Sequence, residues 1–129
     1  MDTDEERLNQ ITEKIIGCAF EVHNTLGPGF AERVYENALV YELRKIGLAV
    51  QQQVPVVVRY KGIVIGEYVA DVIVEAMVSV ENKAVRNFDD GHVAQCLNYL
   101  ACTALPICLL LNFGRKVEVK RFRGGASPH

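Results

Sequence analysis

The segment of residues 68–84, YVADVIVEAMVSVENKA, constrains the fold more than any other part of the chain. It contains two runs rich in β-branched residues, separated by a short turn at 75–77, which is the pattern of a hairpin. A hairpin centred on Ala76 would place Asp71 opposite Glu81, with Lys83 on the same face of its strand. The opposite face would be apolar, and we expect its four valines to be buried: Val72, Val74, Val78 and Val80.

The charged face of this predicted hairpin has two interpretations. Carboxylates directly opposite each other in a strand pair repel, and partly buried charges are costly unless something compensates them. A divalent cation with oxygen ligands would compensate Asp71 and Glu81, with the Lys83 ammonium beside it. Alternatively, Lys83 forms an ordinary ion pair with one carboxylate on a solvated face, and the pattern alone does not decide between the two.

Length and composition predict one compact globular domain. The 129 residues suffice for a single core, and 50% hydrophobic against 23% charged residues is typical of a folded protein. We expect residues 1–5 and 124–129 to be frayed. The net charge of −2 gives little support for binding nucleic acid through bulk electrostatics. Five basic residues near the C-terminus could form either a local basic patch or a solvated strand edge: Arg115, Lys116, Lys120, Arg121 and Arg123.

The sequence also predicts a cytoplasmic protein without a membrane span. The first seven residues are acidic and lack the apolar core of a signal peptide, and no apolar run approaches the length of a span. The four cysteines show no CxxC spacing and each lies in an apolar stretch, so we expect reduced core residues rather than a zinc site or a disulfide framework.

Three helices are expected from apolar periodicity and end signals. The first opens with a capping box at residues 3–6 and ends at the Gly-Pro-Gly of 27–29. The second covers 31–46 and ends at Gly47. The third is capped by Asp89 or Asp90 and runs to Ala101, with an inward stripe at Val93, Leu97 and Leu100. His92, Gln95 and Tyr99 fall on an adjacent, more polar face.

Two polar residues of the first two helices have both structural and functional interpretations. Glu32 lies in the first turn of the second helix, where a carboxylate suits the helix dipole. It could instead be a third carboxylate that reaches the hairpin. We interpret His23 as a residue that interacts with the C-terminal end of the first helix rather than as a catalytic histidine.

The remaining strands complete the predicted architecture. Strands are expected at 54–60 and 63–74, joined by a Lys-Gly turn, with Pro55 placing the first at a sheet edge. The continuous apolar run at 107–112 is typical of a buried strand that follows a helical crossover and is therefore parallel to an earlier strand. Residues 117–122 alternate and predict an antiparallel edge strand. The elements in order are α-α-β-β-β-α-β-β, an α/β fold with a mixed β-sheet flanked by helices.

Several short motifs occur together in a characteristic order. The segment GFAERVY at 29–35 resembles the signature of the GxxExxY proteins, a family placed in the PD-(D/E)XK nuclease superfamily. The resemblance spans about residues 15–121 and includes VAD at 69–71, VENKA at 80–84, AQCLNYL at 94–100 and LLNFG at 110–114. Gln95 and Tyr99 also resemble the QxxxY motif of the RecB-type branch. One difference is Ala70, where the superfamily usually has proline.

The resemblance implies a restriction-endonuclease-like core and a metal-dependent nuclease. Asp71, Glu81 and the backbone carbonyl of Asn82 would bind Mg²⁺ or Mn²⁺, with Glu32 approaching from the second helix. Lys83 would orient or deprotonate the attacking water, and Gln95 would position Lys83 or the phosphate. The expected contacts with substrate come from Tyr99, Tyr35 and His92, with Tyr99 alternatively a support for the site.

Three functions remain open at this point. The first is a nuclease that acts on DNA or, as the second choice, RNA. The second is a catalytically silent nucleic-acid-binding or protein-interaction module on a nuclease fold. The third is a structural domain in which Asp71, Glu81 and Lys83 form only a buried ion-pair cluster. The apolar strands and the edge at 117–122 could also support a homodimer.

Overall fold

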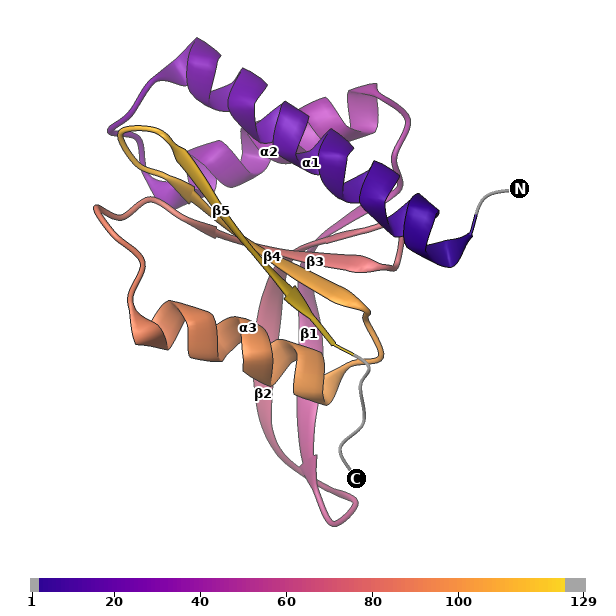
Figure 1. Cartoon of the computed structure of the whole chain (residues 1–129). Helices are drawn as coiled ribbons and strands as arrows, with labels where there is room; N and C mark the ends of the chain where they lie inside the picture. The colour runs from indigo at the N-terminus through magenta and orange to yellow at the C-terminus, as the bar shows by residue number, and fades with distance from the viewer. Residues whose placement is uncertain (1–2, 125–129) are drawn as a thin grey trace.

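The computed structural model of the protein describes residues 3–124 and has the expected α/β architecture (Figure 1). The described part of the chain forms a five-stranded mixed sheet in the order β1-β2-β3-β4-β5 with three helices. The elements are α1 (Asp4–Leu26), α2 (Glu32–Lys45), β1 (Val50–Tyr60), β2 (Ile63–Val74), β3 (Val78–Lys83), α3 (Asp90–Cys102), β4 (Ile107–Phe113) and β5 (Val117–Arg123). The predicted order of elements is confirmed.

The helix ends follow the local signals in the sequence. The Thr3 hydroxyl accepts a hydrogen bond from the backbone N–H of Glu6 at 3.0 Å, which caps α1. Gly27 ends α1 with a φ of +74°, a conformation that glycine adopts at little cost. Asp89 caps α3 and accepts from the N–H of His92, as expected for one of the two candidate caps.

The sheet combines antiparallel hairpins with one parallel pair. β1, β2 and β3 pair in antiparallel fashion, β3 and β4 are parallel, and β5 returns antiparallel to β4. The predicted crossover through α3 is therefore confirmed. β1 begins at Val50, four residues earlier than predicted, because Gln51 and Gln52 pair with Ile73 and Val72 although glutamines do not signal a strand.

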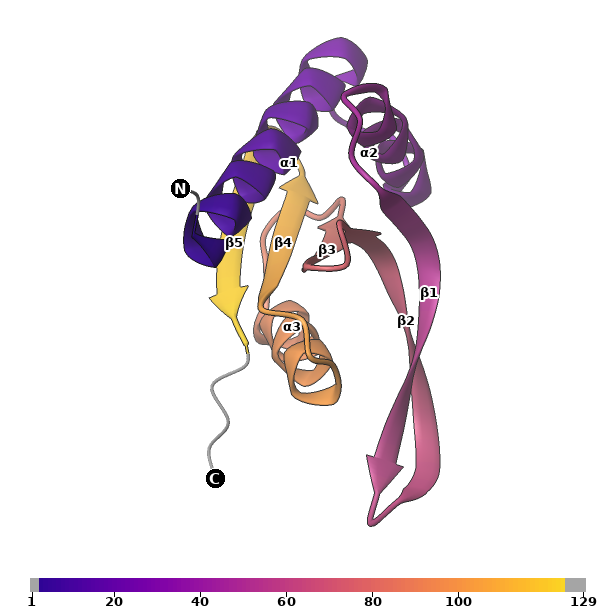
Figure 2. The ribbon, with the colours of Figure 1, turned by 90° about the vertical axis from the view of Figure 1, so that its right-hand side faces the viewer.

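Helices cover both faces of the sheet (Figure 2). α1 and α2 pack on the face that carries the four valines of the β2–β3 hairpin, together with Leu109 and Leu111 of β4. α3 packs on the other face against Cys108 and Leu110. The predicted burial of the valine face is confirmed, since all four valines are fully buried.

The inward face of α3 differs from the prediction at one position. Leu97 is 48% exposed, whereas Cys96, Tyr99 and Leu100 are buried. These three residues are spaced by three and four positions and face the sheet as one stripe, which turns Leu97 outward. The predicted contribution of Leu97 to the core was therefore wrong.

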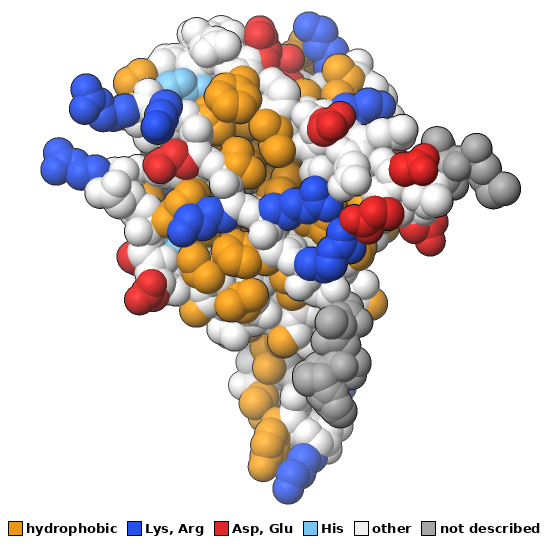
Figure 3. Space-filling model, viewed as in Figure 1, with side chains coloured by type: hydrophobic (Ala, Val, Ile, Leu, Met, Phe, Trp, Pro, Cys, Tyr) orange, Lys and Arg blue, Asp and Glu red, His pale blue; other side chains and the backbone are white. Residues whose placement is uncertain are grey.

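The distal part of the β1–β2 hairpin projects beyond the body of the domain (Figures 1 and 2). Its turn uses Lys61 and Gly62 at positive φ, and its strands expose apolar side chains such as Val57, Ile63 and Ile65. Apolar side chains along this ribbon are visible in Figure 3. No described helix is long and apolar enough to span a membrane. The four cysteines have free thiols, and three of them are buried.

Candidate active site

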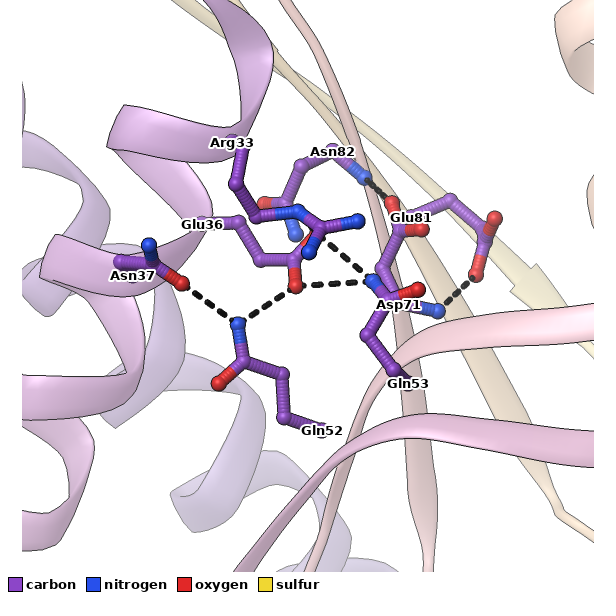
Figure 4. A network of polar contacts seen from close by, with 8 residues as sticks. All are labelled: Arg33, Glu36, Asn37, Gln52, Gln53, Asp71, Glu81 and Asn82. Atoms are coloured by element: carbon purple, nitrogen blue, oxygen red, sulfur yellow. Dashed lines mark hydrogen bonds and ion pairs between the residues drawn. The ribbon is translucent and has the colours of Figure 1, made fainter.

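The two predicted carboxylates lie at the point where β2 and β3 separate. The ladder pairs Val74 with Val78 and Val72 with Val80, as a hairpin centred on Ala76 requires. Beyond Val72 the ladder stops, and the side-chain carboxylates accept hydrogen bonds from the backbone N–H groups. The N–H of Asp71 donates to Glu81 Oε2 at 3.2 Å, and the N–H of Asn82 donates to Asp71 Oδ2 at 2.9 Å (Figure 4). Each acidic side chain thus binds the backbone of the opposite strand.

Burial makes this pair of carboxylates hard to ionise without a cation. Glu81 is 1% exposed, and burial, followed by the charge of Asp71, raises its pKa to about 9. Burial likewise raises the pKa of Asp71 to about 6, with smaller contributions from the charges of Glu36 and Glu32. The acidic pair therefore retains a proton at neutral pH unless positive charge is brought to it.

The donor set fits a hard divalent cation held by few protein ligands. Glu81 Oε1 is buried and has no hydrogen-bond partner within residues 3–124, which leaves an acceptor directed into the site. Within the described residues, no group of three or more His, Cys, Asp and Glu side chains is placed to hold a metal ion. Glu32 is therefore not assembled with Asp71 and Glu81 into a three-carboxylate cluster. Two carboxylates are nevertheless sufficient for Mg²⁺, which keeps waters and substrate oxygens as its other ligands.

Lys83 is directed toward α3 rather than paired with an acid. Its Nζ donates to Gln95 Oε1 at 3.2 Å, so the two residues that the motifs connect are in contact. None of the ion pairs found in residues 3–124 involves Lys83. The interpretation of Lys83 as the partner of one carboxylate is therefore not what the structure shows.

Tyr99 is buried between α3 and the sheet, on the face opposite α1 and α2. It is 1% exposed, its ring packs at a tilt against Tyr68 with centroids 5.7 Å apart, and its hydroxyl has no partner in the described part of the chain. Burial, and then the charges of Glu81 and Asp71, raise the pKa of the Tyr99 phenol. The ring packs beside Ala70 and Ile73 of β2 and has almost no surface exposed to solvent.

Tyr35 and His92, both expected to contact substrate, form contacts within the domain. Tyr35 is fully buried, its hydroxyl donates to the carbonyl of Gly27 at 2.6 Å, and its ring stacks on Phe113 with centroids 4.7 Å apart. A ring without exposed surface cannot touch a substrate in this conformation, which corrects our expectation for Tyr35. The His92 ring accepts from the N–H of Asp89 through Nδ1 at 3.1 Å and completes the cap of α3.

A further acidic residue, Glu36, was missed by the sequence analysis. It is 2% exposed, and its carboxylate accepts from the amides of Gln52 at 2.6 Å and Gln53 at 2.9 Å, with Arg33 Nε at 3.6 Å (Figure 4). Among the causes of the raised pKa of Asp71, the charge of Glu36 ranks before that of Glu32. α2 therefore supplies a buried carboxylate to this site.

A break in the β1–β2 ladder allows this network to form. Gln52 pairs with Val72 and Val54 with Ala70, but Gln53 has a φ of +55° and is left out of the ladder. Such a conformation is uncommon for a residue other than glycine. One sequence signal could have identified Glu36, because it lies three and seven residues before Leu39 and Leu43, on the buried stripe of α2.

We expect Glu36→Ala to lower the free energy of unfolding by about 1–2 kcal/mol, because two half-buried amide groups and an exposed guanidinium lose their acceptor. Urea unfolding followed by circular dichroism measures this loss. Asn37→Ala is the matched control, since it removes one hydrogen bond to Gln52 at the exposed edge of the same network. Equal stability of the Glu36→Ala and Asn37→Ala proteins would contradict the assignment of Glu36 as the centre of the network.

Comparison with protein families agrees with this geometry. The family model described as "PD-(D/E)XK nuclease superfamily" matches residues 9–122. The chain therefore belongs to the PD-(D/E)XK nuclease superfamily. The corresponding searches of curated proteins and of solved structures find no match.

Proposed function

We propose that the protein is a metal-dependent nuclease that hydrolyses phosphodiester bonds, with DNA as the expected substrate before RNA. The observation that carries the proposal is the unsatisfied, buried Glu81 Oε1 beside Asp71, with Lys83 held by Gln95 on the same side of the sheet. Membership of the nuclease superfamily supports the same reaction class. Within this superfamily, we propose that the chain is a member of the GxxExxY family.

In this proposal, Asp71, Glu81 and the backbone carbonyl of Asn82 hold Mg²⁺ or Mn²⁺, since hard oxygen ligands favour these ions over zinc. The chemistry supplied by such a bound cation is Lewis-acid polarisation of a phosphoryl oxygen and a lowered pKa of water. Lys83 orients the attacking water or stabilises the charge that develops on the phosphate. Gln95 restricts where the Lys83 ammonium lies, because its Oε1 accepts from Nζ.

The acidic residues of α2 influence the same site through their charges. In the proposal, Glu32 approaches the cation from α2 as a further acidic group. The charges of Glu36 and Glu32 both disfavour ionisation of Asp71 and so increase the gain from a bound cation. Tyr99 keeps the apolar side of the site closed, and a site that excludes water strengthens each electrostatic interaction within it.

The test is a cleavage assay on single- and double-stranded DNA and RNA with Mn²⁺ or Mg²⁺ against EDTA. The expected result is cleavage that requires the cation and is lost in the Glu81→Ala protein. Cleavage that persists in Glu81→Ala would exclude the proposed mechanism. Nucleic-acid binding without cation-dependent cleavage in any of the four substrates would instead support the catalytically silent module, which the low net charge and the small size of the chain also allow.

A further inference from the structure

A cavity of about 310 Å³ lies beyond the carboxyl end of β3, and Ala84 is part of its wall. It is lined by residues of three separate loops, which are the α1–α2 connection, the segment that follows β3, and the β4–β5 turn. These three segments meet at the left of Figure 1. The proposed reaction does not use this cavity, although Ala84 in its wall directly follows Lys83 in the chain.

Side chains of α1, α2 and β4 hold all three loops in place. Asn112 is fully buried, and its amide both accepts from the N–H of Val85 and donates to its carbonyl, each at 2.8 Å. The His23 ring nitrogen Nε2 contacts the Gly114 carbonyl at 2.8 Å. The Tyr35 hydroxyl joins the carbonyl of Gly27 to the N–H of Phe30. A cavity with walls anchored in this way is preorganised, which lowers the entropic cost of binding a ligand.

The close packing of two of the loops favours a glycine. A Cβ atom at position 114 would lie 3.0 Å from the Val85 carbonyl oxygen and 3.2 Å from Asn112 Nδ2. Gly114 therefore lets the β4–β5 turn approach the segment after β3, and this approach brings the neighbouring Arg115 to the same cavity as Arg86.

The chemistry of the cavity wall is cationic and aromatic. Arg86 and Arg115 are exposed, and neither forms an ion pair with a carboxylate of residues 3–124. Basic side chains gather over these loops at the left margin of Figure 3. Phe30 is 46% exposed, and its ring meets the Tyr35 ring edge to face with centroids 6.1 Å apart. Free guanidinium groups beside an exposed, supported aromatic ring match a phosphate and a base.

We propose that this cavity binds one unpaired nucleotide of a nucleic-acid strand, with the base stacked on Phe30 and its phosphate between Arg86 and Arg115. The proposal rests on the proposed nuclease function and gives its substrate class, which is a single-stranded or frayed strand. A base within an intact duplex is stacked and paired and does not present its face to Phe30.

Binding is measured by fluorescence anisotropy of the full chain with labelled dT12 and with a blunt 12-base-pair duplex, both in EDTA so that no cleavage interferes. We expect the single strand to bind at least about ten-fold more tightly than the duplex. Phe30→Leu should weaken binding of dT12 by about five- to 150-fold, which is the range of one base–aromatic stack. Tyr60→Leu, at another exposed aromatic residue, is the matched control and should change it less than about two-fold.

The arginines are tested through the salt dependence of binding. Arg86→Gln combined with Arg115→Gln should reduce the slope of log K against log salt by about 1.4, the value for two phosphate contacts on a single strand. Arg59→Gln combined with Lys61→Gln removes the same charge from the projecting hairpin and should leave the slope unchanged. Melting temperatures verify that each protein is folded.

Three results would overturn the inference. The first is no binding of dT12, and the second is equally tight binding of the duplex. The third is binding by Phe30→Leu and by the double arginine variant that does not differ from binding by their controls. Failure of the two proposals is distinguishable. Binding that depends on Phe30 and the arginines without cleavage in Mn²⁺ would reject the nuclease function and keep the nucleotide site. Cation-dependent cleavage with unaltered binding in Phe30→Leu would keep the nuclease function and reject the nucleotide site.

Discussion

Glu81→Gln is expected to reduce cation-dependent cleavage at least about 1,000-fold, because a metal-supported transition state loses several kcal/mol when one of two carboxylate ligands becomes a neutral amide. The fold should survive, since burial already favours the neutral form of this side chain, and a glutamine amide is close in shape to a protonated carboxyl group. Initial rates on a labelled oligonucleotide in saturating Mn²⁺ measure the effect.

Glu67→Gln provides the matched control for this experiment. It makes the same chemical change at an exposed position of β2 and should leave the rate within about two-fold, as expected for a surface substitution. A Glu81→Gln protein that keeps a tenth or more of the activity would contradict the assignment of Glu81 as a ligand. Loss of activity together with loss of the folded circular dichroism spectrum would be resolved with Asp71→Asn, for which the same loss of cleavage is expected.

The metal-free protein is expected to lose about 2 kcal/mol of stability between pH 6 and pH 8, a fall of roughly 5–10 °C in Tm. The pKa of Glu81 is raised to about 9 and that of Asp71 to about 6 in the folded state. A raised pKa means that the folded protein holds these protons more tightly than the unfolded chain. The resulting stability is complete below the unfolded values near 4 and is lost as the pH rises through 6 and 9.

Thermal unfolding at pH 6, 7, 8 and 9 in EDTA and in millimolar Mn²⁺ measures this dependence. Mn²⁺ should raise the Tm most at pH 8–9, because a cation that binds the ionised carboxylates stabilises the folded state by mass action. In Glu81→Gln the decline from pH 7 to pH 9 in EDTA should largely disappear, since Asp71 alone titrates below this interval. A wild-type Tm that rises with pH in EDTA, or that Mn²⁺ leaves unchanged at pH 9, would contradict this account of the site.

The contact between Lys83 and Gln95 bears on the choice among the three functions. If the charged residues were only an ion-pair cluster, the Lys83 ammonium would lie against a carboxylate. Its observed partner is instead the neutral amide of Gln95. The carboxylates bind backbone N–H groups, which stabilise them less than a cation would. The charge of Lys83 favours the ionised carboxylates, but burial outweighs it and the pKa of both groups stays raised. This arrangement favours the interpretation in which an external cation binds the pair.

Local patterns in the sequence were sufficient to predict most of the fold. β2 begins and ends at the predicted residues, and the predicted hairpin pairing around Ala76 is the observed one. Both features follow from alternating valines next to a short turn, which are signals within a few residues. The parallel pairing of β3 with β4 was predictable too, because a buried apolar run after a helix leaves few topologies.

The parts of the site that were missed depend on contacts between distant segments. Glu36 is held by Gln52 and Gln53, sixteen and seventeen residues later, through a backbone conformation at Gln53 that its sequence does not signal. The burial of Tyr35 follows from the apolar periodicity of α2, but its stacking on Phe113 is a contact with a distant strand that no local pattern signals. Periodicity identifies which face of an element is apolar, but it does not identify which polar side chains another element will cover.

The crossed hydrogen bonds of Asp71 and Glu81 make the proposed metal site depend on the alignment of the two strands. Because successive side chains in a strand point to opposite faces, a slip of one residue between β2 and β3 would turn one of the two carboxylates into the valine-lined core. The proposed metal ligands therefore come together only in the correctly aligned hairpin. An insertion of a single residue in the Glu75–Met77 turn would separate the ligands without altering any of them, so the length of this turn is as much a part of the candidate site as its acidic groups.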